Sequence, residues 1–389
     1  PGKRITIQRD PIEGTAERIS STFPAIVDEA REGEDILLDD GKLIFEILET
    51  NGKDSVKAKV IQGGPLKSKK GVNLPNTNIS LPALTEKDIK DAIFAISQDV
   101  DWIALSFVRH SQDLIDLQQL IEEHAEHKIP IIAKIEKPEA LAQLDEIVQA
   151  ADAVMVARGD LGVEIDIATV AVVQKQIVAS CRKHVRPVII ATQMLESMST
   201  NRRPTRAEAT DVANAILDGT DCVMLSGESA MGEYPVEAVT MLARIAAAVE
   251  PHRTAYCSRQ VLQGYRKDDP IKIQDLIASS VETTLDRITP ATVIVPTHSG
   301  ATARSITRFK LPVWITAVSS QKKTIQDLMF SYGVWPVHEP DHPEHWRSWA
   351  KNWLQSHDIK ENLVVLTEGP STRHPARNNR MEIIDLRRD

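Results

Sequence analysis

The stretch that decides the fold runs from Ile131 to Glu228. It contains four short apolar runs, IIAKIE (131–136), AVMVARGD (153–160), PVIIAT (187–192) and CVMLSGE (222–228), and a helix-like segment follows each one. Such runs are typical of parallel strands that are buried on both faces, because neither face then needs polar residues. The stretch therefore predicts consecutive strand–helix units.

Polar or charged residues stand where each of these strands ends. They are Lys134, Glu136, Arg158, Asp160, Thr192, Ser226 and Glu228, and a fifth run, DWIALSF (101–107), is followed by Arg109. A doubly wound sheet collects its site at one switch point, whereas a (β/α)8 barrel brings every strand end to one mouth. Polar ends on all five strands favour a barrel that lacks three strands on its N-terminal side.

The chain before this stretch, residues 1–81, is predicted to be a β-rich lid domain. EDILLDDGKLIFEILE (34–49) indicates a hairpin in which Gly41 supplies the positive φ of the turn. KDSVKAKVIQGG (53–64) adds a strand, and a connector with Lys67, Lys69 and Lys70 follows. This lysine cluster is either a solvated loop or a lid that faces a phosphate.

The remaining chain divides into a barrel domain, residues 82–250, and a C-terminal α/β domain, residues 251–389. Thr85 is the expected N-cap of the first barrel helix. Further helices are predicted at 111–127, 138–150, 206–217 and 235–249. A break is predicted at 158–162, followed by a helix that ends at about His184. The last domain is predicted to have a helix at 275–287 and strands within PATVIVP, PVWITAVSS, GVWPVHE and ENLVVLTEGP, and RMEIIDL closes the chain. Trp335, Trp346, Trp349 and Trp353 fit core or interface positions better than ligand platforms.

Composition narrows the class of protein. The chain has 389 residues and a formal net charge of −9, which argues against nucleic acid or an anionic membrane as partner. No apolar run approaches the roughly 20 residues of a membrane span. Three cysteines without a C-x-x-C pair indicate reduced thiols and a cytoplasmic location, not disulfides or a zinc site.

Glu136 and Asp160 are the candidate metal ligands. Two carboxylates that converge at the barrel mouth suit Mg²⁺ or Mn²⁺, which take few protein ligands and share the rest with a substrate. The alternative is that either carboxylate pairs with a neighbour such as Arg158. Lys134 shares a strand face with Glu136, because residues two apart in a strand point to the same side. It is placed to stabilise a transferring phosphoryl group, and a Schiff base is the rival use.

Other strand ends and one loop carry weaker signals. A short helix that opens in RGDLG would aim backbone N–H groups at a substrate carboxylate. Thr192 would orient or protonate a reacting carbon, or cap its strand, and Ser226 with Glu228 would form either a proton relay or a structural turn. The hydroxyl-rich loop from Thr297 to Thr302 suits a phosphate group.

The motifs together resemble the pyruvate kinase family. The resemblance is carried by IIAKIEKPEAL, MVARGDLGVEI, ATQMLESM, RRPTRAEATDVANAILDGTD and MLSGESAMGEYPVEAV, with LDDGKL, KKGVNLP and SLPALTEKD in and after the lid. It runs from about residue 30 to the C-terminus, where EGPSTRHPARNNRMEIIDL resembles bacterial members. It implies a TIM barrel with an inserted small β-barrel domain, a C-terminal regulatory domain, and phosphoryl transfer from phosphoenolpyruvate to ADP, giving pyruvate and ATP in glycolysis.

The resemblance also implies roles for individual residues. Lys134 stabilises the phosphoryl group, Glu136 and Asp160 hold Mg²⁺ or Mn²⁺, and Ala157, Arg158, Gly159 and Asp160 bind substrate. Thr192 lies by the enolate carbon, with Ser226 and Glu228 on the proton path, and Lys70 contacts the nucleotide. A phosphorylated sugar or nucleotide effector would bind Thr297, Ser299, Gly300, Ala301 and Thr302. The family analogy further implies a homotetramer.

The sequence departs from the family pattern at its start. The family's first three barrel strands, which carry an arginine for the substrate phosphate and the ligands of a K⁺ ion, are not in this sequence. We therefore expect the chain as given to be inactive or nearly so. Two other readings stay open, namely a metal-dependent lyase or aldolase for pyruvate-like substrates, and a truncated product kept as a structural or regulatory piece.

Overall fold

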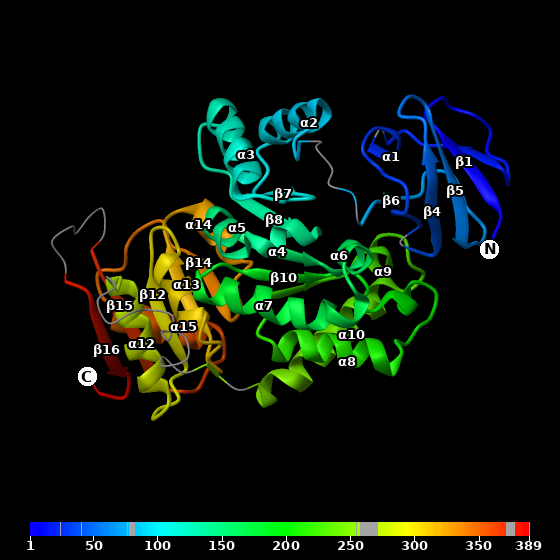
Figure 1. Cartoon of the computed structure of the whole chain (residues 1–389). Helices are drawn as coiled ribbons and strands as arrows, with labels where there is room; N and C mark the ends of the chain where they lie inside the picture. Colours follow the sequence, from blue (N-terminus) through cyan, green and yellow to red (C-terminus); the bar gives the residue numbers. More distant parts are fainter. Residues whose placement is uncertain are drawn as a thin grey trace.

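The computed structural model describes residues 1–23, 25–39, 41–75, 77, 82–253, 255–256, 271–370 and 378–388. These residues form three sheets that follow one another along the chain, of six, five and five strands. Figure 1 shows the N-terminal sheet in blue at one end, the central region in cyan and green, and the C-terminal region in yellow to red at the other end.

The N-terminal region is a lid with its own apolar core. Its strands are β1 (Arg4–Gln8), β2 (Arg18–Ser20), β3 (Asp35–Leu38), β4 (Leu43–Thr50), β5 (Ser55–Gln62) and β6 (Val72–Asn73), in the order β2-β1-β5-β4-β3-β6, and α1 (Ala25–Asp28) is a single turn. The predicted hairpin is confirmed, because β3 and β4 pair antiparallel and Gly41 has a φ of 78°. Burial alternates along β4, so one face of the sheet carries the core.

The central sheet contains the five predicted strands. They are β7 (Ile103–Leu105), β8 (Ile131–Ile135), β9 (Ala153–Ala157), β10 (Val188–Ala191) and β11 (Cys222–Met224), and all neighbours are parallel. Their spatial order is β11-β10-β9-β8-β7, which follows the chain without a reversal. A doubly wound sheet would contain a switch point, so this order agrees with the predicted barrel wall.

The two faces of this sheet have different partners. Ile131, Ala133 and Ile135 pack in the large core that the helices share, whereas Ile132 belongs to a second, smaller cluster. Lys134 falls in the same alternation as Ile132 and therefore lies on the face away from the helices. The catalytic candidate on β8 is thus placed by strand geometry alone.

The helices of the central region follow the strands. They are α2 (Glu86–Ser97), α3 (Ser111–His124), α4 (Pro138–Ala142), α5 (Leu144–Ala150), α6 (Arg158–Glu164), α7 (Val170–Lys183), α8 (Arg206–Leu217), α9 (Gly227–Ala230) and α10 (Pro235–Val249), with short 3₁₀ turns η1 (Ile167–Thr169), η2 (Glu196–Ser199) and η3 (Glu250–His252). Thr85 caps α2 in a capping box, as predicted. The single helix expected at 138–150 is wrong, because the backbone leaves the helical region at Gln143 (φ −121°, ψ 29°).

The C-terminal region is an α/β layer structure. It contains α12 (Ile273–Leu285), β12 (Thr292–Pro296), α13 (Ala301–Thr307), β13 (Ile315–Ser319), α14 (Lys322–Leu328), β14 (Val334–His338), α15 (Trp346–Ser356), β15 (Leu363–Glu368) and β16 (Arg380–Asp385), with strand order β14-β13-β12-β15-β16. Trp346 is buried in this core and Trp349 and Trp353 pack against it, as predicted. Trp335, in contrast, is 44% exposed on the edge strand.

Two further sequence expectations can be compared with the described residues. Cys181 and Cys222 are free thiols, and Cys257 lies outside the described residues. None of the helices described is both long and apolar enough to cross a membrane. The division at 81/82 and 250/251 stays a prediction, although the three regions do have separate apolar clusters.

Candidate functional site

The carboxyl end of β8 brings a lysine and a carboxylate together. Lys134 Nζ lies 2.7 Å from Glu136 Oε1 and donates a hydrogen bond of 2.7 Å to Ser106 Oγ, which follows β7. The Glu136 side chain is 1% exposed, whereas that of Lys134 is 25% exposed. The ammonium group is therefore held between two strand ends but remains reachable from solvent.

The two oxygens of Glu136 have different partners among the described residues. Its Oε2 accepts the backbone N–H of Phe107 at 2.7 Å. Its Oε1 is buried and, within the part of the chain that the structure describes, has the Lys134 ion pair but no contact of hydrogen-bond geometry. A buried carboxylate oxygen in that position can donate an electron pair to a hard cation.

Asp160 contributes charge to the same place. Burial raises the pKa of Glu136, Lys134 and the Phe107 amide lower it, and the negative charge of Asp160 raises it further. The last effect places the two predicted metal carboxylates within electrostatic reach of each other. A cation bound between them would remove this repulsion, so the residues fit a divalent ion.

The backbone is strained around this site. Phe107 and Thr192 have φ angles of 56° and 69°, and Gln193 follows with 53°. Left-handed backbone is unfavourable for a β-branched residue such as Thr192 and costs of order 1–3 kcal/mol. The strain is retained where Phe107 turns its N–H toward Glu136 and where Thr192 contacts Gly159.

The RGDLG motif is itself the start of α6. The Gly159 N–H donates to Thr192 Oγ1 at 2.7 Å, and the same hydroxyl donates to the Ala191 carbonyl at 2.6 Å. A Cβ at Gly159 would lie 3.4 Å from this hydroxyl, so α6 approaches β10 closely. The short helix predicted to open in RGDLG is confirmed as α6, and the later helix to about His184 is α7; only the break expected at 158–162 is wrong, because α6 begins at Arg158 directly after β9.

Arg158 anchors α6 to its neighbours. The side chain is buried, and its guanidinium donates to Asp211 Oδ1 at 2.7 Å and to the Thr192 carbonyl at 2.8 Å. The ion-pair partner of Arg158 among the described contacts is Asp211 on α8. These contacts therefore do not support the alternative that Arg158 pairs with a metal carboxylate. Ala157, the last residue of β9, is buried beside it.

Glu228 connects two strand ends. Its side chain is buried, Oε1 accepts the Leu195 N–H at 3.1 Å, and Oε2 accepts the Ser226 N–H at 2.7 Å. This arrangement supports the turns after β10 and β11. The proton-relay role of Ser226 and Glu228 stays a prediction.

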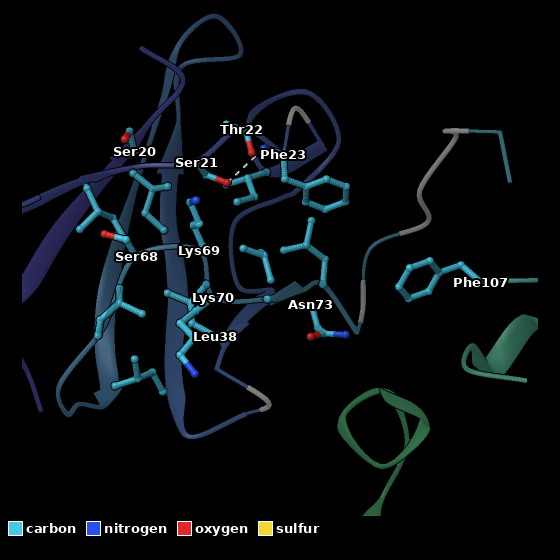
Figure 2. Close-up of a pocket in the computed structure, with 18 of the residues that line it drawn as sticks. Ser20, Ser21, Thr22, Phe23, Leu38, Ser68, Lys69, Lys70, Asn73 and Phe107 are labelled. Carbon is cyan, nitrogen blue, oxygen red and sulfur yellow. Dashed lines mark hydrogen bonds between the residues drawn. The ribbon is translucent and has the colours of Figure 1, made fainter. Parts of the chain in front are cut away.

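The lid faces the central region across a large cavity. The cavity has a volume of about 1750 Å³, and its lining includes Lys67, Lys69 and Lys70 from the lid and Ser106 and Phe107 from the central region. Figure 2 shows Lys69 and Lys70 on the lid side and Phe107 on the facing segment. Ser106 lines this cavity and accepts a hydrogen bond from Lys134, which is not itself one of the lining residues. Lys70 forms a 2.7 Å ion pair with Asp39, and its nucleotide role stays a prediction.

A polar contact fastens the lid to α6. Asn73 Nδ2 on β6 donates to Glu164 Oε1 at 2.9 Å, and Lys137 Nζ lies 2.6 Å from the same oxygen. The Glu164 side chain is only 2% exposed. This contact lies where β6 approaches α6 in Figure 1.

Replacing Asn73 by alanine is expected to loosen the lid. A hydrogen bond to a charged group contributes about 1.5 kcal/mol, so tryptic cleavage after Lys67, Lys69 and Lys70 should become about tenfold faster. Limited proteolysis followed by mass spectrometry measures this rate. Gln8→Ala is the control, because among the contacts described the Gln8 side chain bonds only to the Asp10 carbonyl, within the lid. Equal cleavage rates in the two variants would show that Asn73 does not restrain the lid.

The loop from Thr297 to Thr302 leads into α13 in the C-terminal region. Gly300 has a φ of 79°, and its N–H donates to Thr297 Oγ1 at 2.9 Å. Arg304 Nη2 donates to the Ser299 carbonyl at 3.0 Å. The predicted loop is thus a turn held by these two hydrogen bonds. Its role in binding a phosphate group stays a prediction.

Gly300→Ala is expected to destabilise the protein by about 1–3 kcal/mol. The new Cβ would stand 2.8 Å from Arg304 Nη1 and 2.9 Å from Leu328 Cδ2, and Leu328 is fully buried. Gly333→Ala is the matched control, since Gly333 also has a positive φ but an added Cβ meets nothing within 4 Å. Urea unfolding of both variants checks this, and equal losses would show that only the φ angle matters.

Sequence reasoning missed several residues that build the site. Ser106, Phe107, Asn73, Lys137 and Glu164 were not predicted. Ser106 could have been found, because it is the polar residue that directly follows β7. The others are joined by contacts across 27 to 91 positions of the chain, and no local pattern marks them.

No group of three or more histidine, cysteine, aspartate or glutamate side chains gathers into a metal site among the residues described. A site built from Glu136 and Asp160 would therefore leave most of the coordination sphere to water or substrate oxygens, as Mg²⁺ usually does.

Comparison with known proteins gives consistent matches. The model of the pyruvate kinase barrel domain matches residues 2–239, and that of the pyruvate kinase alpha/beta domain matches residues 275–384. A pyruvate kinase of Geobacillus stearothermophilus is 44% identical over 340 residues, which cover 87% of this chain and 57% of that protein. One of Bacillus licheniformis is 42% identical over 373 residues, 95% of this chain and 63% of that protein.

A solved structure agrees with these matches. The crystal structure of a pyruvate kinase from Cryptosporidium parvum aligns with a TM-score of 0.88 at 32% identity, covering 99% of this chain and 79% of that one. The chain spans about three fifths of the length of the curated relatives that it matches.

Proposed function

Because the chain belongs to the pyruvate kinase family, we propose that the protein that carries it transfers a phosphoryl group from phosphoenolpyruvate to ADP and releases pyruvate and ATP. The observation that carries this proposal is the juxtaposition of Lys134 with Glu136, 2.7 Å apart at the end of β8, with the charge of Asp160 close by. Phosphoryl transfer depends mainly on positioned positive charge, which this arrangement supplies.

Each residue has a role in the proposed reaction. Lys134 stabilises the negative charge of the phosphoryl group as it leaves the enolate oxygen. Glu136 and Asp160 hold Mg²⁺ or Mn²⁺, which when bound neutralises phosphate and carboxylate oxygens of the substrate. The start of α6 orients the substrate carboxylate, and Thr192 lies where the enolate carbon takes up its proton. The Gly159 N–H, now bonded to Thr192, would have to exchange that contact for the substrate.

The remaining family expectations belong to this proposal. Lys70 on the lid would contact the nucleotide, K⁺ would serve as a second cation, and Thr297, Ser299, Gly300, Ala301 and Thr302 would bind the phosphate of a sugar or nucleotide effector. A homotetramer in the cytoplasm is the assembly expected for the family.

A coupled assay tests the proposed reaction. The intact gene product that carries this sequence should form ATP from phosphoenolpyruvate and ADP in the presence of Mg²⁺, and the 389-residue chain is measured beside it. Pyruvate formation without ATP, or cleavage of a larger pyruvate-containing substrate, would favour the lyase or aldolase reading and contradict the proposal.

A further inference from the structure

A small basic cavity lies far from the strand ends described above, where the amino ends of β10 and β11 meet the C-terminal region. Its volume is about 20 Å³. Five cationic side chains line it, Arg182, Arg186, Arg304, Arg308 and Lys310, and Asp221 is the one carboxylate among its described lining residues. Among these lining residues, cationic side chains therefore outnumber carboxylates by five to one.

Asp221 does not neutralise the arginines. Its Oδ1 lies 2.5 Å from Lys310 Nζ and accepts the Tyr332 N–H at 3.0 Å, and its Oδ2 accepts the Val188 N–H at 3.1 Å. Both members of the Lys310 ion pair are buried, with side chains 3% and 7% exposed. The carboxylate is thus committed to one lysine and two backbone amides.

Arg308 is the least satisfied of the cations. Its side chain is 2% exposed, and Nη2 lies 3.0 Å from Asp275 Oδ1 as an ion pair. Over the described ranges, Nε, Nη1 and Nη2 nevertheless have no acceptor in hydrogen-bond geometry. The same holds for Ser331 Oγ, Arg186 Nε and Arg304 Nη1, which belong to other lining residues. Buried donors without acceptors are costly and are normally satisfied by water or an ion.

The pKa shifts of two of these cations also favour a negative charge in the cavity. Burial lowers the pKa of Lys310 despite Asp221, and it lowers the pKa of Arg304 although Asp327 and Asp152 oppose the shift. Both groups would be stabilised in their charged forms by a negative charge in the cavity.

We propose that this cavity binds one small inorganic anion of the size of chloride, which joins the barrel to the C-terminal region. The volume is close to that of one water molecule, which suits a monatomic anion better than phosphate or an organic anion. An anion would accept hydrogen bonds from Arg308 and Ser331 and offset the surplus charge at once. A water molecule would supply acceptors but no charge.

Thermal unfolding at constant K⁺ and constant ionic strength tests the proposal, with gluconate replaced stepwise by chloride. The midpoint should rise by about 2–4 °C and then level off, as expected for a saturable site in a protein of this size. A general salt effect would show no saturation. Arg308→Met should lose the saturable rise, and Ser331→Ala should need more chloride for the same rise. Arg287→Met, a change at an exposed position in the same region, should behave as the unmodified chain.

Diffraction keeps the proposal testable if Arg308→Met fails to fold. Crystals grown in bromide should show an anomalous peak between Arg308 and Ser331, and Arg308→Lys should weaken that peak. The proposal is overturned by a water molecule at this position without anomalous signal. It is also overturned if the unfolding midpoint of the unmodified chain does not depend on chloride. The same conclusion follows if the midpoint depends on chloride equally in the Arg308 variants.

Discussion

Glu136→Gln is expected to weaken Mn²⁺ binding by at least about 100-fold. Loss of residues that merely orient metal ligands costs about 10–100-fold, and Glu136 would be a ligand itself. The change keeps the size of the side chain and the Phe107 contact site, but it removes the charge from a carboxylate that is 1% exposed. Titration of the chain with Mn²⁺, followed by electron paramagnetic resonance of the free ion, gives the dissociation constant.

Glu146→Gln is the matched control for this experiment. Glu146 lies on α5 and is exposed. Its substitution removes the same charge as Glu136→Gln does, but at a position away from the strand ends. It should bind Mn²⁺ as tightly as the unmodified chain does. If both variants bind equally, Glu136 is not a metal ligand and the site has been assigned incorrectly.

Lys134→Met is expected to lower kcat by about 10²–10³, the usual effect of removing one group that stabilises transition-state charge. The measurement is the rate of ATP formation by the intact gene product at saturating substrates. Mn²⁺ binding should be retained or become tighter, because the Lys134 ammonium competes for Glu136 Oε1 at 2.7 Å. The opposite effects on rate and metal affinity separate a catalytic role from a structural one.

Lys128→Met provides the comparison for Lys134. Lys128 precedes the same strand, its side chain is 60% exposed, and it pairs with Asp152. We expect its kcat to stay within about twofold of the unmodified value, as for most surface substitutions. A loss of Mn²⁺ binding in Lys134→Met, or an unchanged kcat, would contradict the role proposed for Lys134.

The parts of the site that were predicted correctly depend on local geometry. Lys134 and Glu136 lie together because residues two apart in a strand face one side, and the sequence alone determines that relation once β8 is recognised. Glu136 and Asp160 follow the paired parallel strands β8 and β9, as predicted, and their role as metal ligands stays a prediction. The helix predicted at 206–217 coincides with α8, and the structure shows that Thr205 and Glu208 form a capping box at its start.

The parts that were missed depend on contacts between distant residues. Nothing near Phe107 in the sequence indicates a left-handed backbone, which occurs together with the hydrogen bond from its amide to Glu136. The alternative that Arg158 pairs with a metal carboxylate could not be settled from the sequence, because its ion-pair partner Asp211 lies 53 positions further along the chain. Asn73 and Glu164 are 91 positions apart and come together only when the lid docks.

The measurement that tests the central claim most directly is anomalous diffraction from crystals grown with Mn²⁺ and phosphoenolpyruvate. The account predicts one strong peak at about 2.1 Å from carboxylate oxygens of both Glu136 and Asp160, with Lys134 and Thr192 facing the substrate beside it. A metal ion bound elsewhere, with Glu136 still paired only to Lys134 and Phe107, would contradict it.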